Sequence, residues 1–155
     1  MVLFTDIVGS TELVTALGDS RWRDLIDSHD RVAHRTVPAH YGRVVKSTGD
    51  GILATFDLPS HAVEAATSMR SQLEDLGLSI RAGLHAGEIE VHPNLDVSGI
   101  AVNIAARIES TASQDQIRIS SALKDLLLGS PHNLDDQGEH QLNGVEGSWR
   151  LFSLS

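Results

Sequence analysis

Short apolar, β-branched runs alternate along this chain with longer stretches in which apolar residues recur at helical spacing. The strand-like runs are Val2 to Val8, Val44-Val45, Ile52 to Phe56, Ile80 to Ala86 and Gln116 to Ile119, with paired strands expected near His140 to Leu142 and Trp149 to Leu154. Helices are expected after the Gly9-Ser10-Thr11 turn, over residues 20–36, from Pro59 to a stop at Gly77, over residues 100–108 and briefly after Ser120. Strands that repeatedly bracket helices predict an α+β sheet with its helices on one face.

Composition limits what such a sheet can bind. With 155 residues, 41% of them hydrophobic, the chain has the size of one domain spanning residues 1–155. A net charge of −9 disfavours binding to nucleic acid or to an anionic membrane, and no apolar run is long enough for direct membrane insertion. A phosphate ligand must then be held locally, and a negatively charged protein can bind a triphosphate if metal ions bridge the two sets of negative charge. The absence of cysteine excludes thiolate chemistry, and we expect a cytoplasmic domain.

Two aspartates carry the main chemical signal. Asp6 lies near the end of the first apolar run, and Asp50 lies in Ser47-Thr48-Gly49-Asp50-Gly51, which is typical of a hairpin tip. Each aspartate alone fits a structural role. Together they offer hard oxygen ligands that can converge on divalent cations, as two-metal phosphoryl chemistry requires. The Gly9-Ser10-Thr11 turn adds backbone N–H groups at a helix N-terminus, where phosphate oxygens bind well.

Two further pairs suit the rest of a nucleotide. Lys46 alone reads as a solvated lysine, but a lysine donor with the Asp96 acceptor matches N1 and the 6-amino group of adenine, whereas guanine inverts that pattern. Asn103 and Arg107 are four positions apart and share one face of the expected helix over residues 100–108. An amide and a guanidinium there suit ribose positioning and stabilisation of charge on a phosphoryl group.

Three motifs together resemble the class III adenylate and guanylate cyclase catalytic domain, most closely the bacterial, mycobacterial-type adenylate cyclases. The similarity covers nearly the whole chain and rests on Phe4-Thr5-Asp6-Ile7-Val8-Gly9-Ser10-Thr11, Lys46-Ser47-Thr48-Gly49-Asp50-Gly51 and Asp96-Val97-Ser98-Gly99-Ile100-Ala101-Val102-Asn103-Ile104-Ala105-Ala106-Arg107. The resemblance implies the cyclase homology domain, with a ferredoxin-like βαββαβ-type core sheet. It also implies conversion of ATP to 3′,5′-cyclic AMP and pyrophosphate.

The resemblance implies a role for each motif residue. Two Mg²⁺ or Mn²⁺ ions would bind Asp6 and Asp50, with the Ile7 carbonyl as a further ligand. Substrate would contact Ile7, Val8, Gly9, Ser10 and Thr11, while Lys46 and Asp96 read the base. Asn103 would orient the ribose, and Arg107 would stabilise the transition state. The active sites would be shared across a homodimer, with the metal-binding carboxylates from one copy and the other four residues from the next. The proton acceptor stays open between water, substrate and Asp6.

One position departs from the family pattern. Asn143 stands where similar domains often carry a lysine that reaches the triphosphate, and Arg150 or Lys124 could replace its charge. This difference keeps open a vestigial cyclase domain that acts as a nucleotide-binding or dimerisation module. A different metal-dependent nucleotidyl transferase is the third alternative, although such enzymes typically carry adjacent acidic residues at the hairpin, and here a single aspartate is flanked by glycines.

Overall fold

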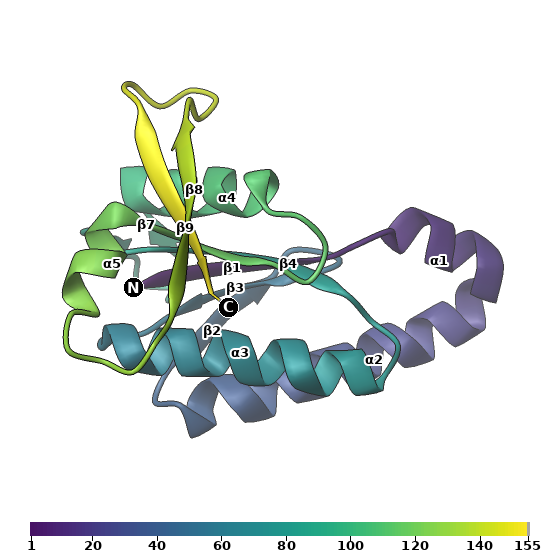
Figure 1. The fold of residues 1–155 in the computed structure, drawn as a ribbon. Coiled ribbons are helices and arrows are strands. Elements are labelled where there is room, and N and C mark those ends of the chain that lie inside the picture. Colours follow the sequence, from purple (N-terminus) through teal and green to yellow (C-terminus); the bar gives the residue numbers. More distant parts are fainter. Residues whose placement is uncertain (155) are drawn as a thin grey trace.

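A seven-stranded sheet runs through the centre of the computed structural model, which describes residues 1–154 (Figure 1). Its strand order is β2-β3-β1-β4-β7-β9-β8, and the β4–β7 pair is parallel whereas the other pairs are antiparallel. The strands of this sheet are β1 (Val2–Ile7), β2 (Arg43–Ser47), β3 (Ile52–Thr55), β4 (Ile80–His85), β7 (Ile117–Ser120), β8 (Leu134–His140) and β9 (Trp149–Leu154). The helices are α1 (Ser10–Leu17), α2 (Asp19–Ala39), α3 (Pro59–Asp75), α4 (Ile100–Thr111) and α5 (Ser121–Leu126). These elements confirm the predicted α+β class.

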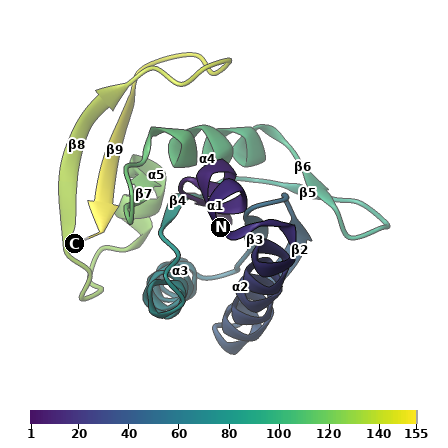
Figure 2. The same cartoon turned by 90° about the vertical axis from the view of Figure 1, so that its right-hand side faces the viewer.

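Helices cover both faces of the sheet, whereas the sequence predicted them on one. Figures 1 and 2 show α2 and α3 on one side and α4 on the other. Strand β1 explains the difference, because Leu3 and Ile7 belong to the core cluster that includes α2 and α3, while Val2 and Phe4 pack with Ala105 of α4. Alternate residues of a strand point to opposite faces, so a strand that is apolar on both faces needs a cover on each.

The strands differ from the prediction in two places. A small second sheet, β5 (Glu90–Val91) with β6 (Val97–Ser98), was not predicted, because two-residue strands leave no periodic signal. It forms an arm beside the main sheet and leads through Gly99 directly into α4 (Figure 2). The strand expected near His140 to Leu142 is instead β8, which ends at His140; Leu142 is a buried loop residue packed against α4. Among residues 1–154, no helix has the length and apolar character needed to cross a membrane.

Candidate functional site

Asp6 and Asp50 are brought together because β3 runs antiparallel beside β1, so that the tip of the β2–β3 hairpin lies against the end of β1. A side chain at position 51 would overlap the Thr5 carbonyl oxygen, so only glycine permits this approach. Two hydrogen bonds hold the hairpin tip against β1: the Ile7 N–H donates to the Asp50 carbonyl at 2.8 Å, and the Ile52 N–H donates to Thr5 Oγ1 at 3.2 Å. The sequence prediction that the two carboxylates share one region of the molecule is therefore supported by local geometry.

The pKa of Asp6 responds to its surroundings. Burial raises the pKa of Asp6 above its ordinary value, the adjacent Asp50 raises it further, and Arg81 opposes both effects. The Ser10 hydroxyl donates to Asp50 Oδ2 at 2.8 Å, which ties the start of α1 to the hairpin. A pair of acidic groups in a partly buried position is an environment that attracts a cation, because a positive charge removes their mutual repulsion.

Arg81 is a site residue that sequence reasoning missed. It lies directly opposite Asp6 in the β1–β4 pairing, and one guanidinium nitrogen donates to Asp6 Oδ2 at 2.6 Å. This carboxylate raises the pKa of Arg81, so the guanidinium stays charged. The signal was present in the sequence, because Arg81 interrupts one apolar strand as Asp6 interrupts another, and buried charges are usually paired.

Glu109 is the second missed residue. It lies on α4 with 9% of its surface exposed, and its Oε1 is 3.5 Å from Nε of Arg81. Burial raises the pKa of Glu109 to about 7, with a further contribution from Asp6. Helix α4 reaches this position because Gly83 of β4 carries no side chain; an added Cβ would overlap the backbone at Ala105 and Glu109. In the sequence Glu109 is four positions after Ala105, on the same helix face as the apolar stripe, so the spacing already indicated a carboxylate turned toward the sheet.

The donor set of the Asp6–Asp50 pair fits a hard divalent cation. Within residues 1–154, no three or more His, Asp or Glu side chains are arranged as a closed metal cage. Mg²⁺ ordinarily binds through one or two carboxylates and takes its remaining ligands from substrate phosphates and water. Two carboxylates with a nearby hydroxyl and backbone carbonyls therefore match an open site better than a structural one.

The turn after β1 supplies part of what was expected of it. Gly9 has a left-handed φ of 69° and begins α1, so Gly9, Ser10 and Thr11 present first-turn amides. The other two amides of the expected phosphate-binding stretch are occupied, because the Ile7 N–H donates to Asp50 and the Val8 N–H donates to the Ser79 carbonyl at 2.8 Å. The expected contacts of Ile7 and Val8 with substrate are therefore limited to their carbonyls and, for Val8, the partly exposed side chain.

Lys46 and Asp96, both expected to read the base, form an ion pair with each other. Lys46 lies on β2 and Asp96 immediately before β6, and Nζ is 3.2 Å from Oδ1 and 3.3 Å from Oδ2. A second contact steadies the arm, since Arg43 donates to the Leu95 carbonyl at 2.9 Å. The Val97 N–H and then Lys46 lower the pKa of Asp96, so the carboxylate is ionised and can accept a hydrogen bond. Both side chains are solvent-accessible, as groups that contact a ligand must be.

Asn103 and Arg107 lie on the exposed side of α4. Within the described part of the chain, no hydrogen bond or ion pair joins either residue to the Asp6–Asp50 pair. Arg107 shares a hollow with Asn143. The two cations considered as replacements for a lysine at position 143 are engaged elsewhere: Arg150 pairs with Asp136 at 2.7 Å, and Lys124 lies over the Phe152 ring.

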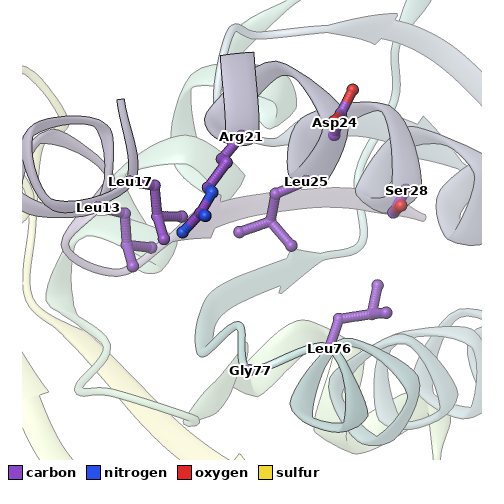
Figure 3. A pocket seen from close by; sticks show the side chains of 8 residues that line it. All are labelled: Leu13, Leu17, Arg21, Asp24, Leu25, Ser28, Leu76 and Gly77. Atoms are coloured by element: carbon purple, nitrogen blue, oxygen red, sulfur yellow. The ribbon is translucent and has the colours of Figure 1, made fainter. Parts of the chain in front are cut away.

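A larger hollow lies away from these residues, between α1, α2 and the end of α3 (Figure 3). Its volume is about 460 Å³, and four of its eight lining residues are leucines, namely Leu13, Leu17, Leu25 and Leu76. No carboxylate pair or glycine-rich turn opens into it. The candidate site is therefore placed by its chemistry and not by the size of a cavity in one copy of the chain.

The sequence of the whole chain, residues 1–155, matches the family described as "Adenylate and Guanylate cyclase catalytic domain". Among its relatives, a putative adenylate cyclase of Rhizobium meliloti is 31% identical over 99% of the chain. An adenylate cyclase of Streptomyces coelicolor is 28% identical over 81% of it. The chain spans 28% of the first relative and 33% of the second.

Solved structures agree on the fold. An adenylyl cyclase of P. aeruginosa has a TM-score of 0.89 at 22% identity, over 99% of this chain and 92% of the other. The guanylate cyclase domain of a Catenaria anguillulae protein, solved in complex with GTP, has a TM-score of 0.78 at 22% identity, over 99% of this chain and 94% of that one. The fold is thus common to enzymes named for either nucleotide, and preference for a base must come from individual side chains.

Proposed function

Because this chain belongs to the adenylate and guanylate cyclase catalytic domain family, we propose that it is an adenylate cyclase that converts ATP to 3′,5′-cyclic AMP and pyrophosphate. The observation that carries this proposal is the Asp6–Asp50 pair. The close contact of Gly51 with Thr5 holds the two residues together, beside a turn that presents first-turn amides at the start of α1. In the reaction the ribose 3′ oxygen bonds to the α-phosphorus, the bond to the pyrophosphate oxygen breaks, and the 3′-hydroxyl loses its proton.

Asp6 and Asp50 would hold two Mg²⁺ or Mn²⁺ ions, with the Ile7 carbonyl as a further ligand. When bound, these ions supply Lewis acidity to the 3′-hydroxyl and neutralise charge on the departing pyrophosphate. The amides of Gly9, Ser10 and Thr11 would bind phosphate oxygens, because first-turn N–H groups lack partners within the helix.

Preference for ATP is assigned to the Lys46–Asp96 pair. The lysine donates and the ionised aspartate accepts, which matches N1 and the 6-amino group of adenine. Guanine offers a donor at N1 and an acceptor at O6, so each group would face a group of its own kind. A site built to hydrogen-bond one base discriminates strongly against another, because a mismatched polar group loses its partner on binding.

The remaining residues favour an active site shared between two copies of the chain. Asn103 and Arg107 point outward from α4 and make no hydrogen bond or ion pair with the carboxylate pair among the described residues. We propose that they complete the site of a partner chain, where Asn103 orients the ribose and Arg107 stabilises charge on the reacting phosphoryl group. A homodimer would then contain two equivalent sites.

The direct test is to incubate purified protein with Mn²⁺ and either ATP or GTP, and to measure cyclic nucleotide and pyrophosphate. We expect cyclic AMP and pyrophosphate in equal amounts from ATP, at a rate per chain that rises with protein concentration. The Asp50→Asn variant should lose the activity, whereas Asp27→Asn, on the exposed side of α2, should retain it. Absence of product at every protein concentration would instead indicate a vestigial domain that only binds nucleotide or dimerises.

A further inference from the structure

Arg81 lies between two carboxylates, and among the described residues it forms a hydrogen bond with only one of them, Asp6. We propose that Arg81 is an internal counter-ion that competes with the divalent cation for Asp6, and that Glu109 is a positioning residue that receives Arg81 when the cation binds. This inference rests on the proposed function, because it takes Asp6 and Asp50 as the cation site. It adds a mechanism by which the negative charge of the site is partly neutralised before the cation binds.

The contacts of Arg81 are unequal. A terminal guanidinium nitrogen donates to Asp6 Oδ2 at 2.6 Å, a short charge-assisted hydrogen bond. On the other side, Nε lies 3.5 Å from Glu109 Oε1 without hydrogen-bond geometry. These two atoms, Arg81 Nε and Glu109 Oε1, are both buried, and neither has a hydrogen-bond partner within residues 1–154. Unpaired buried polar atoms are uncommon in folded proteins, and here the donor and the acceptor face each other.

The unpaired atoms define where Arg81 can move. A small rotation of the guanidinium away from Asp6 would close the Nε to Oε1 gap and satisfy both atoms. The backbone need not move, since Asp6 and Arg81 are fixed by strand pairing and Glu109 by the close contact of α4 with Gly83. The alternative position is therefore built into the packing of α4 on β4.

Charge balance favours this exchange when a cation binds. Asp6, Asp50 and Glu109 interact electrostatically with one another and with a single guanidinium. When all three carboxylates are ionised, one guanidinium leaves them with excess negative charge, whereas a guanidinium and the first divalent cation to bind together balance them. Since the cation and Arg81 repel each other, the cation takes Asp6 and Asp50 while Arg81 moves to Glu109. Loss of Glu109 would leave Arg81 on Asp6, where it obstructs the cation.

The test measures Mn²⁺ binding without nucleotide, by electron paramagnetic resonance of free Mn²⁺, in the wild type, R81Q, E109Q and the double variant. R81Q should tighten Mn²⁺ binding about tenfold, because the competitor is gone, and E109Q should weaken it about fivefold. In the R81Q background, E109Q should change the affinity by less than about twofold, since no guanidinium is left to position. Two variants at exposed positions, Arg23→Gln and Glu74→Gln, serve as controls, because they change the net charge by the same amounts as R81Q and E109Q.

Each contrary result has a distinct meaning. If the E109Q effect is equally large with and without Arg81, Glu109 acts through its own charge and the positioning role is wrong. If R81Q leaves Mn²⁺ binding unchanged or weaker, Arg81 is not a competitor. If the Asp50→Asn variant binds Mn²⁺ as tightly as the wild type, the cation does not bind at Asp50 and the inference is wrong. By contrast, Mn²⁺ binding that follows the expected pattern in a protein that makes no cyclic AMP contradicts the proposed function and leaves the Arg81 exchange standing.

Discussion

At the scale of single residues, the site is a small set of charges held at the edge of the core. Asp6 and Glu109 both have raised pKa values, and in both cases burial is the first cause. A buried carboxyl with a raised pKa costs stability when it ionises, because folding removes it from water. If Asp6 and Asp50 bind a cation as proposed, this cost to the stability of the metal-free protein would be offset when the cation binds.

This cost should appear as a pH dependence of stability. For Glu109 the folded pKa of about 7 lies above the unfolded value of 4.5, so its ionisation penalises the folded state. The penalty is absent below the unfolded pKa, grows as pH rises, and is complete above about pH 7, where it reaches roughly 3 kcal/mol at most. Urea denaturation of metal-free protein between pH 4.5 and 8 should show that the free energy of unfolding of E109Q increases relative to that of the wild type as pH rises. A constant difference between the two proteins would contradict the raised pKa.

Lys46 supports a second residue-scale prediction. Lys46→Glu would place a carboxylate against Asp96 and remove the donor to adenine N1, so kcat/KM for ATP should fall at least about tenfold. Lys46→Arg keeps a donor and should retain part of the activity. The pair is exposed, with 50% and 39% of the two side chains accessible, so neither change should move the melting temperature appreciably. Unchanged kcat/KM for ATP in Lys46→Glu would remove Lys46 from base recognition.

At the scale of elements, glycines decide how closely the pieces approach. Gly51 lets the tip of the β2–β3 hairpin pack closely against β1, and Gly83 lets α4 pack closely against β4. Each contact places one acidic residue, Asp50 in the first case and Glu109 in the second. The sequence showed the hairpin glycines as turn formers, but their role as points of backbone contact depends on what lies opposite, which no local pattern reveals.

A Gly51→Ala change should separate the hairpin from β1. The added methyl group would overlap the Thr5 carbonyl, and we expect a loss of about 1–3 kcal/mol in the free energy of unfolding, as for other overpacked positions. Mn²⁺ affinity should fall as well, because Asp50 moves away from Asp6. Thr48→Ala, at an exposed position of the same hairpin, is the matched control for both measurements. If Gly51→Ala has the unfolding free energy and the Mn²⁺ affinity of the wild type, the position of the hairpin tip against β1 does not depend on this contact.

At the scale of the whole molecule, one copy of the chain keeps apart the two groups of residues that the proposed reaction needs. The carboxylate pair lies beneath the N-terminus of α1, while Asn103 and Arg107 lie on the outside of α4. Helix α4 covers the face of the sheet opposite α2 and α3, and it is this placement that turns its polar residues outward (Figure 1). A site assembled from two copies follows if both halves are needed for the reaction.

Mixing experiments test this assembly. Asp6→Ala and Arg107→Ala should each be inactive alone, and a mixture should recover up to about a quarter of wild-type activity, since random pairing makes half of the dimers mixed, each with one intact site. Asp6→Ala mixed with Asp50→Ala should recover nothing, because both changes damage the same half. If the first mixture stays as inactive as its components although subunits exchange, as shown by fluorescence transfer, the site is not shared in this way.

The sequence by itself determined the fold class, most strand and helix positions, and the residues that carry the resemblance, because these depend on local periodicity and on motif spacing. Tertiary structure alone decided which residues meet. It placed Arg81 on Asp6, brought Glu109 over Arg81, used the amides of Ile7 and Val8 within the fold, and put α4 on the second face of the sheet. These outcomes depend on strand register and on backbone contacts between distant segments, and such contacts leave no pattern within either segment alone.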